Sequence, residues 1–233
     1  MSARQIDNGG SLVDHAVQAV RGHIREHDLK VGDSLPGEGH FAAQLGVSRA
    51  VMREAFGALA ALRLLDVGNG RRARVGAIDG SVIGASLDHA VTTSQISVAE
   101  VWDVRRTLEM RIAALAAERR SDEQAEQILA LAEAMVRDQG NMALVTAHDT
   151  AFHQILAAST GNMLFTQIVR SFAPQMEIAV PRAWETRHAQ DQKATILSLH
   201  RRIAHAIAEK NPSEAVAAME EHFDASIGDL LPR

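Results

Sequence analysis

Four residues in the second half of the chain could together hold a metal ion. Asp149 and His153 are four residues apart, so on a helix their side chains would leave the same face. His200 and His222 each stand among apolar residues, which favours inward-facing imidazoles. One carboxylate and three imidazoles from three helices suit a divalent transition metal in a helical core. An Asp-x-x-x-His pair alone is more often an ordinary pair on a helix surface, so both interpretations stay open at this point.

A second group of residues, near the N-terminus, could bind an anionic partner. Arg49 and Arg53 are also four residues apart, on a predicted helix that Ser48 would cap. A tight turn at residues 46–47 separates this helix from a shorter one before it. Two guanidinium groups beside a helix N-terminus suit the phosphates and base edges of a DNA major groove. The same spacing also fits a plain helical hairpin with two solvated arginines.

The residues that follow favour DNA binding. Residues 62–67 are apolar enough for a short strand, and residues 71–75 form a second predicted strand that contains three arginines. Between them, Asn69-Gly70 supplies the positive φ values that a tight hairpin needs. Residues 46–76 contain six arginines and two acidic residues, a local charge of +4, whereas the whole chain carries −5. A helix-turn-helix followed by a basic hairpin is a winged helix, and its concentrated positive charge is typical of nucleic-acid binding.

This N-terminal segment resembles the DNA-binding domain of the GntR family of bacterial transcription regulators. It contains Leu35-Pro36-Gly37-Glu38, Gly46-Val47-Ser48-Arg49, Met52-Arg53-Glu54-Ala55 and Gly68-Asn69-Gly70. The resemblance runs over roughly residues 11–76. Gly39 departs from the family pattern, which usually has a DNA-contacting arginine there, so the other arginines are expected to carry more of the recognition. The residues expected to contact DNA are Glu38, Ser48, Arg49, Arg53, Gly70, Arg71 and Arg72.

Composition narrows the class of protein. The 233 residues include no cysteine, which excludes disulfides and thiolate metal sites. The chain has no apolar run long enough to cross a membrane, and its first ten residues are polar and unlike a signal peptide, so we expect a cytoplasmic protein without membrane partners. Two Trp, six Phe and no Tyr argue against binding single strands or RNA by base stacking.

The pattern predicts a mainly α protein in two parts. A winged helix-turn-helix with a small β-hairpin wing is expected over residues 9–77, and an antiparallel all-α bundle over residues 95–231. A linker is expected over residues 78–94, where Gly, Ser and Thr cluster and helical periodicity fades. Residues 1–80 carry 10 basic and 9 acidic groups, which leaves 14 basic and 20 acidic groups, or −6, in the rest. The bundle is therefore not expected to contact DNA.

Capping and periodicity predict where the helices of the bundle lie. Ser121 with Gln124 is a capping box, and Asn211-Pro212 reads as an N-cap followed by a first-turn proline. Pro174 and Pro181 are expected to interrupt or kink the helical region around them. The predicted helices are 98–120, 121–138, 142–158, 190–210 and one from 212 onwards.

The helical region resembles the FCD type of effector domain found in the FadR-like branch of GntR regulators. Many members bind a metal through an Asp-x3-His pair and two later histidines, and the matching positions are Asp149, His153, His200 and His222. The family's first helix usually has an arginine four residues before a glutamate, which Arg105 matches. The resemblance implies that Arg105 faces the metal and pairs with the carboxylate of an organic-acid effector. Zinc is the expected metal, and nickel and manganese also fit.

Taken together, these features predict a transcription regulator rather than an enzyme. We expect a homodimer that places two winged helices on a double-stranded DNA operator, with binding controlled by a small carboxylate. Two alternatives remain. In one, the metal itself is the signal. In the other, the chain is a helical metalloenzyme. Two features argue against an enzyme: the sequence has no second carboxylate at a suitable offset, and the basic wing would have no role in catalysis.

Overall fold

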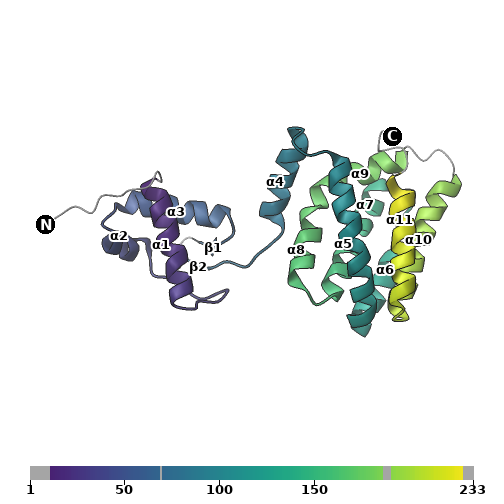
Figure 1. The fold of residues 1–233 in the computed structure, drawn as a ribbon, viewed down its shortest axis with the longest axis horizontal. Coiled ribbons are helices and arrows are strands. Elements are labelled where there is room, and N and C mark those ends of the chain that lie inside the picture. The colour runs from purple at the N-terminus through teal and green to yellow at the C-terminus, as the bar shows by residue number, and fades with distance from the viewer. Residues whose placement is uncertain (1–10, 69, 186–189, 228–233) are drawn as a thin grey trace. The chain divides into compact units, whose positions relative to one another are not determined.

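The computed structural model describes residues 11–68, 70–185 and 190–227. The chain divides into two compact units, Met1–Val82 and Ile83–Arg233 (Figure 1). The predicted domain limits at residues 9 and 231 lie outside the described residues, as do Asn69 of the predicted turn and His188. No helix in the described ranges is long and apolar enough to cross a membrane.

The N-terminal unit is a three-helix core with a small hairpin. Ser11 caps its first helix through a capping box with Asp14, and the Ser48 side chain accepts the Val51 N–H at the start of the third. Gly46 adopts φ 68° and closes the second helix in the left-handed conformation. The elements are α1 (Leu12–Glu26), α2 (Glu38–Leu45), α3 (Arg49–Ala61), β1 (Leu65–Asp66) and β2 (Arg74–Val75).

The strands of the wing are shorter than predicted. β1 pairs antiparallel with β2, and Leu65 lies opposite Val75. Helix α3 continues to Ala61, and Arg63 then takes φ 56°, so residues 62–64 form a turn instead of the start of a strand. Gly70 has φ 73°, which agrees with the positive φ expected in the described half of the hairpin turn.

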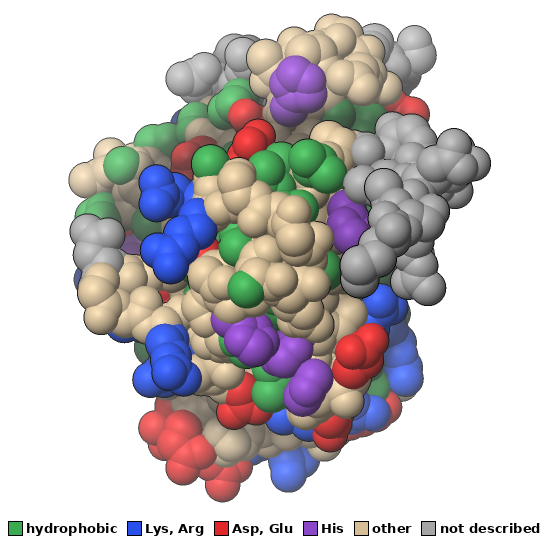
Figure 2. All heavy atoms as spheres, turned by 90° about the vertical axis from the view of Figure 1, so that its left-hand side faces the viewer, with side chains coloured by type: hydrophobic (Ala, Val, Ile, Leu, Met, Phe, Trp, Pro, Cys, Tyr) green, Lys and Arg blue, Asp and Glu red, His purple; other side chains and the backbone are tan. Residues whose placement is uncertain are grey.

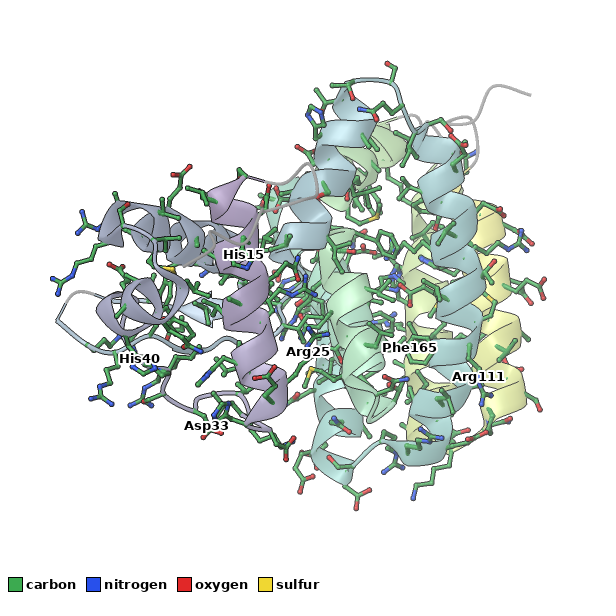
Figure 3. The ribbon with its side chains drawn as sticks, turned by 60° about the vertical axis from the view of Figure 1, so that its left-hand side comes forward. His15, Arg25, Asp33, His40, Arg111 and Phe165 are labelled. Carbon is green, nitrogen blue, oxygen red and sulfur yellow. The ribbon has the colours of Figure 1, made fainter. Side chains whose placement is uncertain are left out.

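The C-terminal unit is a bundle of helices. In it α10 packs along α11 and α6, and α5 packs against α11 and α7 (Figure 1). Its core includes Ile112, Phe152, Leu156 and Ile203, and Phe165 of α8, labelled in Figure 3, packs against this core. The helices are α4 (Ser81–Thr92), α5 (Val98–Arg119), α6 (Asp122–Arg137), α7 (Met142–Ser159), α8 (Met163–Ser171), α9 (Ala173–Glu185), α10 (Gln190–Ala208) and α11 (Pro212–Ile227).

Residues 78–94, predicted as a linker, contain helix α4. The Asp79 carboxylate accepts the Ser81 N–H at 2.9 Å, just where the helix begins. Gly84 is buried, and a Cβ placed on it would lie 3.2 Å from the backbone oxygen of Ser171 on α8. One of the small residues that suggested a linker therefore permits close packing between two helices.

The two prolines behave differently. The break between α8 and α9 falls at Phe172, and Pro174 occupies the first turn of α9, where a missing N–H costs no helical hydrogen bond. Pro181 lies inside α9, which continues through it to Glu185. The expected interruption thus occurs near Pro174, whereas Pro181 does not end the helix.

Candidate functional site

A groove on the N-terminal unit gathers most of the residues predicted to contact DNA. Its volume is about 550 Å³, and helix α3, the start of α2 and the wing form its walls. Figure 2 views the molecule from this side and shows Lys and Arg side chains at the left-hand edge and again at the lower right. The predicted residues that line the groove are Glu38, Arg49, Arg53, Gly70, Arg71 and Arg72. Ser48, the remaining one, caps α3 beside the groove.

The arginines of the groove are exposed and only lightly paired. Arg53 Nε lies 3.8 Å from Glu38 Oε2, and Arg71 Nη2 lies 2.8 Å from Asp66 Oδ1. Exposed pairs of this kind contribute little to stability, so phosphate oxygens can replace the carboxylates at small cost.

Gly39 leaves room that Arg49 uses. A Cβ placed on Gly39 would lie 3.4 Å from Arg49 Nη2 and 3.6 Å from its guanidinium carbon. The Arg49 side chain thus lies across the position where the related family carries another arginine, which places its charge at the start of α2.

In the C-terminal unit, three histidines form a buried cluster. His153, His200 and His222 each offer one ligand atom, and these atoms all lie within 4.8 Å of one another. Asp149 Oδ1 lies 3.1 Å from His200 Nε2. The structure therefore brings together the three predicted histidines, from α7, α10 and α11, and Asp149 joins the cluster through His200.

The hydrogen-bond partners of His200 define which atoms its two ring nitrogens face. Its Nδ1 lies 2.9 Å from the carbonyl oxygen of Ile196, which can only accept, so Nδ1 carries the hydrogen. In the neutral ring Nε2 then has a lone pair, yet it faces a carboxylate oxygen of Asp149. Two electron-pair donors at this distance require a proton or a cation between them.

The other two histidines also have a polar atom near Nδ1. Nδ1 of His153 lies 2.9 Å from Glu109 Oε1, and Nδ1 of His222 lies 3.4 Å from the Ser226 hydroxyl. Both ring nitrogens of His153 are buried and make no directional hydrogen bond. Metal-binding histidines usually hold their second ring nitrogen in this way, so the donor set fits a divalent transition metal.

Burial and neighbouring charges shift the pKa values of two residues of this cluster. Burial lowers the pKa of His222 well below its ordinary value, and the neighbouring His200 and His153 lower it further, so His222 stays neutral. Burial alone would raise the pKa of Asp149, but the hydrogen bond from His200 and the charge of His153 outweigh it. The pKa of Asp149 therefore falls, and its carboxylate is ionised.

Arg105 lies next to this cluster and is 3% exposed. Its Nε donates to Glu109 Oε1 at 3.2 Å, and its Nη1 contacts the Met176 sulfur. The rings of Trp102 and Phe223 each lie 5.5 Å from its guanidinium carbon, at a distance typical of cation–π contacts.

Arg105 and three of the four predicted metal ligands, Asp149, His200 and His222, line one cavity of about 30 Å³. Asp149, His200 and His222 form its polar side, and Ala179 and Trp184 of α9 form part of its apolar wall. This volume suits a water molecule or an ion and is too small for an organic acid.

Sequence reasoning missed part of this site. From the sequence, Glu109 was recognised only as the glutamate four residues after Arg105, although its side chain contacts both Arg105 and His153. Met176 and Trp184 of α9 carry no local sequence signal, because only tertiary packing brings them to the site, whereas Trp102 lies three residues before Arg105 on α5. Among the other histidines, His148 Nε2 lies 2.9 Å from Asp138 Oδ2, outside the cluster.

Comparison with known proteins extends over nearly the whole chain. The model described as "Bacterial regulatory proteins, gntR family" matches residues 12–75, and that of the FCD domain matches residues 100–225. The HTH-type transcriptional regulator LutR of Bacillus subtilis is 29% identical over 213 residues, which cover 89% of this chain and 95% of LutR. The HTH-type transcriptional repressor NanR of Salmonella newport is 28% identical over 205 residues, covering 87% and 78%. A solved Streptococcus agalactiae GntR structure aligns with a TM-score of 0.65 and 26% identity, covering 91% of this chain and 97% of that one.

Proposed function

The chain belongs to the gntR family of bacterial regulatory proteins, with an FCD domain as its helical unit, and we propose that an organic acid bound beside a metal ion controls its operator binding. As a member of this family, the protein is a DNA-binding transcription regulator. The observation that carries the proposal is the shared cavity, which Arg105 lines together with Asp149, His200 and His222.

DNA recognition is assigned to the groove of the N-terminal unit. Arg49 and Arg53 would contact phosphates or guanines from α3, since a recognition helix reads the major groove with residues near its N-terminus. Arg71 and Arg72 would act from the wing. We further propose a cytoplasmic homodimer, because two symmetric winged helices match the two halves of a pseudo-palindromic operator.

Asp149, His153, His200 and His222 would hold the metal. Imidazole and carboxylate ligands suit zinc, and nickel and manganese are the alternatives. When bound, the ion would supply a positive charge for one carboxylate of the effector. Arg105 would bind a carboxylate of the same molecule through its Nη atoms, because Glu109 already accepts from its Nε.

Entry of the acid would require the cavity to enlarge. A space of about 30 Å³ holds roughly one water molecule, so the α9 wall at Ala179 and Trp184 would move outward. Helix α9 also carries Gln175. With its amide oriented to satisfy its neighbours, Gln175 donates to the Ser171 backbone oxygen at 3.2 Å and accepts the Asp88 N–H of α4 at 3.3 Å. A displaced α9 would therefore act on α4, the helix that follows the DNA-binding unit in the chain.

Direct metal sensing is the second candidate function. The specific observation in its favour is the size of the cavity, which suits an ion and not an acid. In this version, loading of the histidine cluster alone would change operator affinity.

One titration separates these functions. An operator is first selected from random DNA duplexes, and its affinity is measured by fluorescence anisotropy for metal-free protein, for Zn²⁺-loaded protein, and with added citrate or gluconate. The acid-controlled regulator predicts that an acid changes the affinity of the Zn²⁺-loaded protein by at least about fivefold. Arg105→Ala is the control, because chelation of zinc by the acid would persist in this variant whereas specific binding would not.

A change on loading with Zn²⁺ alone would favour metal sensing. If neither metal nor any acid of a broader panel altered the affinity, control through this cavity would be refuted.

A further inference from the structure

Glu109 is a buried carboxylate that lies between the two parts of the ligand-binding region. It is 0% exposed and stands one helical turn after Arg105 on α5. The same oxygen, Oε1, lies 3.2 Å from Arg105 Nε and 2.9 Å from His153 Nδ1. A carboxylate at this depth is costly unless positive or hydrogen-donating groups face it, and these two residues face Oε1, whereas Oε2 is buried with no hydrogen-bond partner in the described structure.

The contact with His153 determines which ring nitrogen is available for metal. The 2.9 Å approach is not aligned as a linear hydrogen bond, since Nδ1 has no partner by directional criteria. A negative oxygen at that distance nevertheless favours the tautomer with hydrogen on Nδ1. The lone pair is then on Nε2, the nitrogen that has no other partner in the structure.

The corresponding groups on the other two histidines are neutral. His200 is held by the carbonyl of Ile196, and His222 by the Ser226 hydroxyl. Among the three histidines, His153 is therefore the one whose Nδ1 faces a charged group, Glu109. A negatively charged partner raises the basicity of an imidazole ligand.

The contact with Arg105 fixes the orientation of the guanidinium. With Nε donating to Glu109 and the rings of Trp102 and Phe223 close to the group, the plane of Arg105 has little freedom to turn. A guanidinium held in one orientation loses less conformational entropy when it binds a carboxylate.

We propose that Glu109 is the positioning residue that makes the metal site and the anion site one unit, by orienting His153 toward the metal and Arg105 toward the acid. The inference rests on the proposed function, since it assumes a metal at the histidine cluster. It adds that one carboxylate, which touches neither metal nor acid, sets the affinity for both.

The test compares Glu109→Gln with Glu118→Gln, the same chemical change at an exposed position on the same helix. Zn²⁺ affinity is measured by competition with a chromophoric chelator across pH. We expect Glu109→Gln to weaken Zn²⁺ binding by about 10- to 100-fold and Glu118→Gln to leave it unchanged.

Nuclear magnetic resonance supplies a readout that simple destabilisation would not move. In the metal-free wild-type protein, ¹⁵N shifts should show His153 with hydrogen on Nδ1, and the Arg105 Nε–H should be protected from exchange. Both signatures should be lost in Glu109→Gln and retained in Glu118→Gln. If Glu109→Gln does not fold, the His153 tautomer of the wild-type protein decides the question, and hydrogen on Nε2 would overturn the proposal.

The outcomes separate this inference from the function on which it rests. Equal Zn²⁺ affinities for wild type and a folded Glu109→Gln would refute the role of Glu109 and leave the metal centre intact. A wild-type protein that binds no Zn²⁺, Ni²⁺ or Mn²⁺ would refute the metal centre itself.

Discussion

At the scale of single residues, arginine side chains have different environments in the two units. Arg49 and Arg53 are exposed and lightly paired, so their charge is available to a polyanion at little desolvation cost. Arg105 is buried, and it is tolerated there because Glu109 and two aromatic rings surround it. Accessibility thus separates an arginine suited to DNA from one suited to a small carboxylate.

Arg49→Ala tests the recognition helix. We expect operator affinity to fall by about 1–3 kcal/mol and base preference to relax, because this guanidinium lies at the start of α2 over Gly39 as well as on α3. Fluorescence anisotropy with selected and point-mutated duplexes measures both effects. The matched control is Arg111→Ala, an exposed arginine on α5 of the other unit, labelled in Figure 3. Unchanged affinity and preference in Arg49→Ala would remove α3 from the reading surface.

Asp149→Ala combined with His153→Ala tests the metal ligands. Removing half of the donor set should abolish co-purifying metal, measured by elemental analysis, because two imidazoles alone bind a divalent ion weakly. Asp138→Ala with His148→Ala is the control, since it removes another Asp–His pair, 2.9 Å apart, outside the cluster. Full metal content in the Asp149/His153 double variant would place the metal elsewhere.

At the scale of elements, helix α9 contacts both the cavity and α4. Its Trp184 side lines the cavity, while Gln175 at its other end bonds to α4. Gly84 lets α4 approach α8 closely at the same place. Gln175 of α9 and Ser171 of α8 therefore provide close contacts that attach α4 to the effector unit.

Gly84→Val tests this attachment. Valine methyl groups would meet the Ser171 backbone, where a Cβ alone would already lie at 3.2 Å, and overpacking of this kind costs about 1–3 kcal/mol. Hydrogen exchange should therefore accelerate in α4 while the core amides of α5 and α7 stay protected. Gly140→Val is the control, because a Cβ at Gly140 meets nothing within 4 Å. Unaltered protection of α4 would show that it does not depend on this contact.

At the scale of the whole molecule, charge and chemistry are divided between the two units. Residues 1–80 carry 10 basic and 9 acidic groups, whereas residues 81–233 carry 14 and 20. The excess negative charge of the helical unit opposes its contact with DNA, so binding is directed to the basic groove. A regulator gains from this division, because effector chemistry can change in one unit without altering the reading surface of the other.

Local sequence determined most of the elements and the type of protein. Serine caps at residues 11, 48, 97 and 121 begin helices, and Gly46 ends one, because caps satisfy backbone groups over a single turn. The helix-turn-helix, the basic wing and the gntR and FCD patterns follow from short spacings of this kind. Helix α4 and the true length of the wing strands were not predictable, since tertiary packing on α8 and the turn at Arg63 override weak local preferences.

The tertiary structure alone decided how the chemically active residues meet. Sequence spacing placed Asp149 and His153 on one helix face, but their approach to His200 and His222 depends on the packing of α7, α10 and α11. The same holds for Glu109, whose spacing to Arg105 is visible in the sequence and whose contact with His153 is not. A periodic sequence pattern specifies which face of a helix is buried. The neighbouring helices then determine which side chains share the buried space, because close packing leaves room for one arrangement.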